Sequence, residues 1–190
     1  MNHDAEILAT QIDGIAHSLG TWIAGGIGHL KNRPESWGFA GNPTLQTLTM
    51  LHVALEGTSA KSPALLECGS GFGFVAALAR ELGFSVTGIE VVPEYIELSR
   101  RLFPAVRIVE DDLLTWDHFG DFDVVYYNGP FAHDQIQANF ERRIETRLRP
   151  GGIILAVRKV DHTWQASGAF DLLWTDGALR WVLRKHPAVA

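Results

Sequence analysis

The chain has 190 residues, of which 46% are hydrophobic and 20% are charged, and its net charge is −6. This length suits one domain with an extension, and an acidic chain without a Lys/Arg block does not fit a binder of long nucleic acid. No apolar run approaches the roughly 18 residues that are needed to span a membrane. The single cysteine, Cys68, excludes an internal disulfide and, with no secretory signal, predicts a cytoplasmic protein.

The N-terminal part predicts helices separated by a loop. Residues 4–24 carry apolar side chains at a period of about 3.6 residues, which indicates a helix that packs on the main domain or on a partner subunit. Glycines and prolines then mark a loop-rich segment that contains Trp37 and Phe39. A second helix is expected to begin near Thr44 and to end at Gly57.

Residues 63–90 predict a strand, a glycine-rich turn, a helix and a second strand. The strands are expected at 64–68 and 85–89, and the helix at 74–82. Glycine in the turn allows a tight bend and a close approach to a ligand, and the start of the helix offers unpaired N–H groups. Glu90, at the end of the second strand, is placed to accept hydrogen bonds from a ribose diol. This stretch therefore predicts a nucleotide-binding βαβ unit.

Two side chains discriminate between the possible nucleotides. A dinucleotide fingerprint requires a small residue at position 74, but the chain has Phe74. Glu67 would repel the phosphates of a dinucleotide and suits a cationic cofactor. The sequence E-C-G-S-G-F-G at residues 67–73 resembles the first motif of the class I S-adenosylmethionine (SAM) methyltransferases. The resemblance implies SAM as the cofactor and a three-layer Rossmann-like α/β fold, with a mostly parallel seven-stranded sheet and a reversed terminal strand.

The same resemblance implies which residues bind the cofactor. In that family the turn holds the methionine end of SAM, and the acid after the second strand holds the ribose. The residues at these positions are Glu67, Gly69, Ser70, Gly71, Gly73, Glu90 and Val91. In some members a Pro-Thr pair at the start of the preceding helix contacts the amino-acid end of SAM, which adds Thr44; helix capping is the alternative role of Thr44. We expect residues 1–60 to be a helical extension that covers the cofactor or acceptor or forms a homodimer contact, and residues 61–190 to be the SAM-binding domain.

The third strand is predicted at residues 106–109, and three acidic residues follow it. Adjacent carboxylates at the end of a strand are costly unless something recruits them. In the resembled family, an acid at this position accepts a hydrogen bond from the adenine amino group, and the next backbone N–H meets a ring nitrogen. The order D-L-L favours Asp112 together with Leu113, with Asp111 as the second choice. A solvated acidic turn is the alternative.

The fourth predicted strand, at residues 122–127, leads into the sequence N-G-P-F at residues 128–131. In open α/β sheets, ligands bind at the carboxyl ends of central strands. The tetrapeptide resembles the N-P-P-[YF] motif of amino-group methyltransferases, in which the Asn holds the target nitrogen and the aromatic ring packs on the acceptor. Gly129 replaces the first proline and is expected to loosen the loop. The resemblance implies Asn128 and Phe131 as active-site residues, with Asn128 also next to the cofactor.

His133 is a candidate general base near the acceptor. The alternative is that His133 lies on the surface and that Asp134 is the N-cap of the next helix. That helix is expected to include residues 136–148. Its arginines are expected to form a solvated face with Glu141 and Glu145; they are Arg142, Arg143, Arg147 and Arg149.

The C-terminal part predicts a strand at residues 153–157 and then a hairpin with strands at 170–174 and 179–183. A dinucleotide dehydrogenase would continue with another parallel βα unit, whereas the resembled family ends on a reversed strand. The loop before the hairpin is expected to lie at the same sheet edge as Asn128 and to shape the acceptor pocket. Its candidate residues are His162, Trp164 and Gln165.

These features predict methyl transfer from SAM to an unidentified acceptor. A small molecule fits the acidic charge and the compact size. The first alternative is a protein lysine methyltransferase, because small lysine-modifying members share the Pro-Thr helix start, the G-S-G turn and a Trp-containing loop. The second alternative is a SAM-binding module without catalysis. We expect no metal, since the eight histidines are scattered without ligand spacing.

Overall fold

The computed structural model describes residue 3, residues 7–14 and residues 44–187. Of the helix expected at 4–24, residues 7–14 are helical. The rest of that helix and the loop-rich segment with Trp37 and Phe39 lie outside the described residues.

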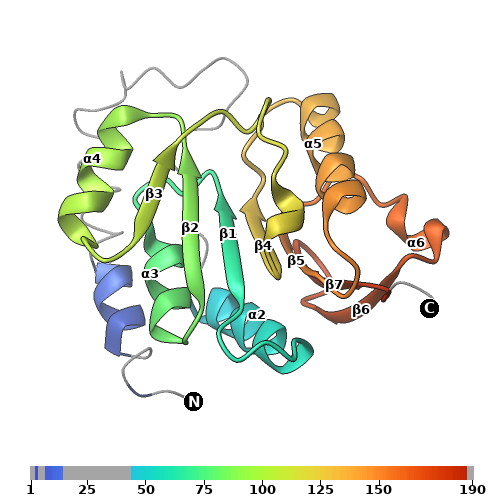
Figure 1. The fold of residues 1–190 in the computed structure, drawn as a ribbon, viewed down its shortest axis with the longest axis horizontal. Helices are drawn as coiled ribbons and strands as arrows, with labels where there is room; N and C mark the ends of the chain where they lie inside the picture. The colour runs from blue at the N-terminus through green and yellow to red at the C-terminus, as the bar shows by residue number, and fades with distance from the viewer. Residues whose placement is uncertain (1–2, 4–6, 15–43, 188–190) are drawn as a thin grey trace.

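Strands and helices alternate along the described chain (Figure 1). The strands are β1 (Ala64–Cys68), β2 (Ser85–Glu90), β3 (Arg107–Glu110), β4 (Val124–Asn128), β5 (Ile153–Val157), β6 (Phe170–Thr175) and β7 (Arg180–Lys185). The helices are α2 (Thr44–Gly57), α3 (Phe74–Glu81), α4 (Pro93–Leu102), α5 (Asp134–Arg147) and α6 (Trp164–Ser167), with a short 3-10 helix η2 (Phe119–Asp121). All the elements expected between residues 44 and 187 are present. The short elements η2 and α6 were not expected.

The strands form one seven-stranded sheet in the order β3-β2-β1-β4-β5-β7-β6. β1 pairs in parallel with β2 and with β4, while β7 is antiparallel to both β5 and β6. The predicted fold is therefore confirmed: a Rossmann-like, mostly parallel sheet whose last strand is reversed. We call the side where β1 to β5 end the carboxyl edge. Because the strand order reverses between β1 and β4, the loops after these two strands diverge there, and such a point binds ligands in open α/β sheets.

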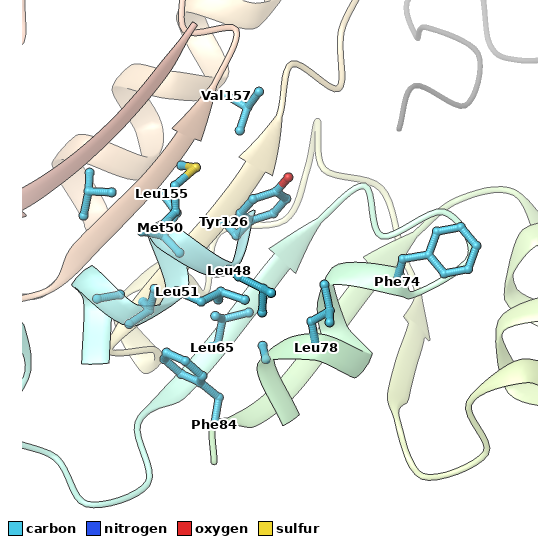
Figure 2. Packing of buried hydrophobic residues seen from close by; sticks show 14 of the residues in the cluster. Leu48, Met50, Leu51, Leu65, Phe74, Leu78, Phe84, Tyr126, Leu155 and Val157 are labelled. Atoms are coloured by element: carbon cyan, nitrogen blue, oxygen red, sulfur yellow. The ribbon is translucent and has the colours of Figure 1, made fainter. Parts of the chain in front are cut away.

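Successive side chains of the central strands point to opposite faces of the sheet, and both faces are buried. On one face, Leu65 of β1 packs with Leu48 and Leu51 of α2 and with Leu78 of α3, as Figure 2 shows. On the other face, the neighbouring residue Leu66 belongs to a second cluster with residues of α5. The helices thus form a layer on each side of the sheet.

The described N-terminal residues also join this core. Ala9 and Ile12 are buried in the same cluster as α2, and the hydroxyl of Thr44 donates a hydrogen bond to the carboxylate of Asp13. Residues 7–14 therefore pack on the sheet domain, and α2 is part of the layer that covers the sheet. The division of the chain at residue 60, the covering role and the homodimer contact stay predictions.

Candidate functional site

The loop after β1 has a backbone that depends on glycine. Gly69, Gly71 and Gly73 have φ values of +70°, +53° and +78°, a left-handed region that side chains with a Cβ rarely adopt. A Cβ on Gly69 would also lie 3.3 Å from the Cβ of Pro130, in the loop after β4. The loops after β1 and β4 therefore approach each other at the point where the strand order reverses.

Contacts with β2 hold this loop in place. The N–H groups of Gly69 and Ser70 both donate to the carbonyl oxygen of Ile89, at 3.0 and 2.9 Å. The side chain of Ser70 packs over Gly88, where a Cβ would lie 2.8 Å from the Cβ of Ser70. Ser70 is thus buried between the loop and β2 and serves to anchor the loop.

Glu90 makes the strongest link between the loop and β2. Its Oε2 accepts a hydrogen bond from the N–H of Gly71 at 2.7 Å, and its Oε1 accepts from the N–H groups of Val91 and Val92 at 2.8 and 3.0 Å. Hydrogen bonds to an ionised acceptor are among the stronger ones in proteins. The carboxylate is mostly buried at the carboxyl edge, where the ribose contact was predicted. That contact stays a prediction.

Glu67 lies beneath the loop, with only 3% of its surface exposed. Its Oε2 accepts a hydrogen bond from the N–H of Ala76 in the first turn of α3, at 2.9 Å. Burial raises the pKa of Glu67 well above its usual value, the nearby Glu90 adds to this, and the bond from Ala76 acts in the opposite direction. Glu67 therefore connects β1 to α3. Its predicted effect on a cationic cofactor would be indirect, because Glu67 lies beneath the loop.

The acids after β3 build a tight turn. The N–H of Asp111 donates to the carbonyl oxygen of Glu90 at 3.0 Å, and Oδ1 of Asp112 accepts from the N–H of Leu114 at 2.9 Å. Leu113 is buried, and its Cδ1 lies 4.0 Å from where a Cβ on Gly69 would be. The structure thus brings the turn that begins at Asp112 next to the glycine loop.

The loop after β4 departs from the resembled motif in its backbone. Gly129 has a φ of +44°, whereas the ring of proline restricts φ to about −65°. A proline at this position would need a different loop. A loosened N-P-P-[YF] loop was expected from the sequence, but the structure shows a conformation that requires glycine.

The predicted acceptor residues after β4 are divided between the surface and the core. Asn128, the last residue of β4, pairs in register with Val157 at the end of β5. The ring of Phe131 is buried edge-on against Phe140 of α5, with ring centroids 5.3 Å apart. His133 is exposed at the N-cap of α5, so Asp134 is the first helical residue and not the cap. The packing of Phe131 in the core favours a structural role; the catalytic roles of all three stay predictions.

Comparison with known proteins agrees with this arrangement. Residues 65–152, from β1 to the turn before β5, match a family model described as a methyltransferase domain. This part of the chain is thus similar to the methyltransferase family, and the sheet has the Rossmann-like fold of its class I members. This family agrees with SAM as the predicted cofactor.

Three relatives illustrate the similarity. The chain is 26% identical over 159 residues to 2-methyl-6-phytyl-1,4-hydroquinone methyltransferase of Synechocystis sp., covering 75% of this chain and 50% of the relative. It is 29% identical over 111 residues to protein-L-isoaspartate O-methyltransferase of Chlorobaculum parvum, covering 56% of this chain and 47% of the relative. The chain thus spans about half the length of these curated relatives. A solved RNA methyltransferase of Salinibacter ruber, in complex with S-adenosylhomocysteine (SAH), has a TM-score of 0.59 and 20% identity, covering 80% of this chain and 96% of that chain.

One important residue near the carboxyl edge was assigned wrongly from the sequence. Arg143 of α5 was expected on a solvated face. Its Nη1 donates to the carbonyl oxygens of Leu113 and Leu114 at 3.1 and 2.8 Å, and its Nη2 donates to that of Trp116. One guanidinium thus holds three carbonyls of the turn predicted to bind adenine. The local charge pattern of α5 gave no signal for this role, because it depends on how α5 lies against that turn.

The same helix carries a buried polar network. Glu141, also expected on the solvated face, is completely buried and accepts hydrogen bonds from Nε2 of Gln137 at 2.8 Å, from the N–H of Asp161 at 2.8 Å and from Nζ of Lys159 at 3.3 Å. Gln137 in turn accepts the N–H of Phe131 at 3.1 Å. The network therefore connects the loop after β4 with the loop after β5.

The loop before the hairpin lies against the last two strands of the sheet. Trp164 is buried at the start of α6, and α6 contacts β6, the strand at the far edge of the sheet. The ring of His162 lies against Trp181 of β7, with centroids 5.2 Å apart. Trp181 pairs with Ala156 near the carboxyl end of β5, and Trp164 belongs to the same buried cluster as Phe131. The expectation that this loop shapes an acceptor pocket beside Asn128 stays a prediction.

Three further observations concern the described residues alone. No group of three or more His, Cys, Asp or Glu side chains is arranged there to hold a metal ion. None of the helices described is long and apolar enough to cross a membrane. Cys68 is buried, and burial raises the pKa of its thiol well above the usual value.

Replacing Glu67 by Gln should stabilise the protein near pH 7. The folded-state pKa of Glu67 is raised by burial, so its contribution to stability is greatest below the ordinary carboxyl pKa of about 4.3 and falls as the pH rises toward the folded-state value. Glutamine keeps an oxygen for the N–H of Ala76 and cannot ionise. Urea denaturation from pH 4 to pH 8 should show a gain for Glu67→Gln that grows with pH.

The exposed Glu94 of α4 provides the control, since Glu94→Gln should show no such trend. A Glu67→Gln variant that is less stable than the wild type at pH 7 would contradict this interpretation.

Replacing Arg143 by Ala should weaken SAH binding by about 1 to 2 kcal/mol, because three carbonyls of the turn lose a charged donor. Isothermal titration measures this loss. Arg147→Ala on the same helix is the matched control, since Arg147 makes an exposed ion pair with Asp117, and such pairs contribute little. Equal affinities of both variants and the wild type would remove Arg143 from the cofactor site.

Proposed function

We propose that this chain binds SAM at the carboxyl edge of β1, β2 and β3 and transfers its methyl group to a small molecule held beside β4. The observation that carries the proposal is the Glu90 carboxylate, which joins the glycine loop to the end of β2 through the N–H groups of Gly71 and Val91. The match of residues 65–152 to a methyltransferase domain supports it.

The residues at this edge fit the parts of the cofactor. Glu90 would hold the ribose hydroxyls, and Asp112 with the N–H of Leu113 would hold the adenine. The glycine loop would hold the methionine end, since a Cβ at Gly69 would come within 3.3 Å of Pro130 and fill the space between the two loops. Thr44 is bonded to Asp13 at the start of α2, so a cofactor contact by its hydroxyl would require that bond to change.

Methyl transfer requires little of the protein beyond the alignment of the acceptor with the cofactor. The bound cofactor supplies a methyl group that is already activated by its positively charged sulfur. The side chains therefore have to orient the acceptor and exclude water. Asn128 lies at the end of β4, and its amide both donates and accepts hydrogen bonds, which suits an acceptor nitrogen or oxygen. The exposed imidazole of His133 is available to accept a proton from an oxygen acceptor.

A small-molecule acceptor agrees with the hydroquinone substrate named for the Synechocystis relative and with the acidic charge of the chain. A protein side chain is the second candidate, and the similarity to protein-L-isoaspartate O-methyltransferase favours it. A planar amine held as in the N-P-P-[YF] motif is disfavoured, because Gly129 has a φ of +44° and Phe131 is buried.

An assay with methyl-labelled SAM and a fractionated cell extract should label the small-molecule fraction. Asn128→Ala should lower this labelling more than it lowers SAH affinity, because Asn128 is assigned to the acceptor. Gln135→Ala, an exposed polar change on α5, provides the control.

Label that appears only in protein bands would replace the small-molecule proposal by the second candidate. Tight SAH binding without any labelled product would favour a SAM-binding module without catalysis.

A further inference from the structure

Arg158 has an unusual backbone at the carboxyl edge. Among the described residues it is the only one other than glycine with a positive φ, which is +57°. It directly follows β5, whose last residue Val157 pairs with Asn128. Residues with a Cβ pay a conformational cost in this region, and such strained residues cluster at functional sites. The left-handed backbone of Arg158, beside the proposed acceptor residue, therefore points to a role in ligand binding.

The side chain of Arg158 lies along the loop after β4. A Cβ on Gly129 would be 3.1 Å from the Cβ of Arg158 and 3.5 Å from its Cδ. The aliphatic stem of the arginine thus occupies the space that a side chain at position 129 would need. This contact gives a second reason for glycine in the N-G-P-F sequence, besides its φ, and it places the arginine stem against the residue that follows Asn128.

The guanidinium of Arg158 differs from those of the other arginines that follow β4. Five of these are paired with aspartates, and Arg143 holds backbone carbonyls; the five are Arg142, Arg147, Arg149, Arg180 and Arg184. Arg158 is exposed, and no described carboxylate lies within ion-pair distance of it. An arginine without a carboxylate partner presents a planar fork of donors that matches a carboxylate or phosphate.

Apolar side chains flank the arginine. The N–H of Arg158 donates to the carbonyl oxygen of Leu179 at 2.8 Å, which brings the turn between β6 and β7 to this edge. Leu179 is 49% exposed and Val160 is 39% exposed. Exposed apolar groups near a cationic residue fit a ligand that combines an apolar body with an anionic group.

We propose that Arg158 binds an anionic group of the acceptor, so that the substrate is a small organic acid or phosphate ester with an apolar body. This inference rests on the proposed methyl transfer and adds the substrate class and a binding residue to it. The anionic group is distinct from the atom that receives the methyl group. Gly129 and the left-handed backbone of Arg158 then serve to direct the guanidinium beside Asn128.

The test uses the full chain with methyl-labelled SAM and a small-molecule extract. The labelled product should be retained on an anion-exchange column, and Arg158→Gln should lower its yield by roughly tenfold or more, the loss expected for one charge-assisted contact. Arg158→Lys should restore part of the yield, and SAH affinity should be the same in all variants. Arg107→Gln, an exposed arginine at the amino end of β3, is the control and should behave like the wild type.

Phosphatase treatment of the labelled product distinguishes the two anions. A phosphate ester loses its phosphate and is no longer retained on the column, whereas a carboxylate is still retained. A labelled product that passes through the column, or full activity of Arg158→Gln, would overturn this inference. The proposed function would still hold in that case, provided that the wild type binds SAH. Label found only in protein would overturn this inference as well. A wild-type chain that binds no SAH would overturn the proposed function and this inference together.

Discussion

The site depends on how one carboxylate, that of Glu90, holds two segments together. A glycine loop with three left-handed residues has little intrinsic preference for one conformation, because glycine loses more backbone freedom on folding than any other residue. The bonds from Gly71, Val91 and Val92 to Glu90 give the loop a defined position at the end of β2. The two N–H groups that donate to Ile89 act in the same direction. The position of the glycine loop therefore depends on hydrogen bonds to a single buried acid.

Helix α5 organises the remaining loops of the same edge. Arg143 holds the turn after β3, and the network of Gln137 and Glu141 joins the loops after β4 and β5. Burying the Glu141–Lys159 pair is costly unless its hydrogen bonds are satisfied, and the bonds to Gln137 and to the Asp161 N–H satisfy them here. One helix thus fixes the relative positions of the loops to which adenine and acceptor are assigned. This explains why an amphipathic helix carries so many polar groups on its inner side.

The sequence predicted most of the fold, because the relevant signals are local. The apolar runs of β1 and β5 and the turn residues of the β6–β7 hairpin each specify their own element, and their order implies the sheet. The contact between the glycine loop and Glu90 was predictable for the same reason, since both belong to one βαβ unit. The role of Arg143 was not, because its partners lie about 30 positions earlier in the chain, from Leu113 to Trp116. The backbone conformation of Gly129 was also not predicted, because the requirement for glycine comes from close packing against Arg158 on a neighbouring loop.

The three relatives differ in the acceptor that their names state, a hydroquinone, a protein and an RNA. The residues that match a methyltransferase domain, 65–152, include the glycine loop and Glu90, and SAM binding at that edge is what we propose. Isothermal titration of the wild type with SAH and with NAD tests it most directly, with Glu90→Ala and the exposed Glu94→Ala as a matched pair of variants. The structure predicts that SAH binds far more tightly than NAD and that only Glu90→Ala weakens SAH binding, by about 1 to 3 kcal/mol. Tighter binding of NAD, or an unchanged SAH affinity in Glu90→Ala, would contradict it.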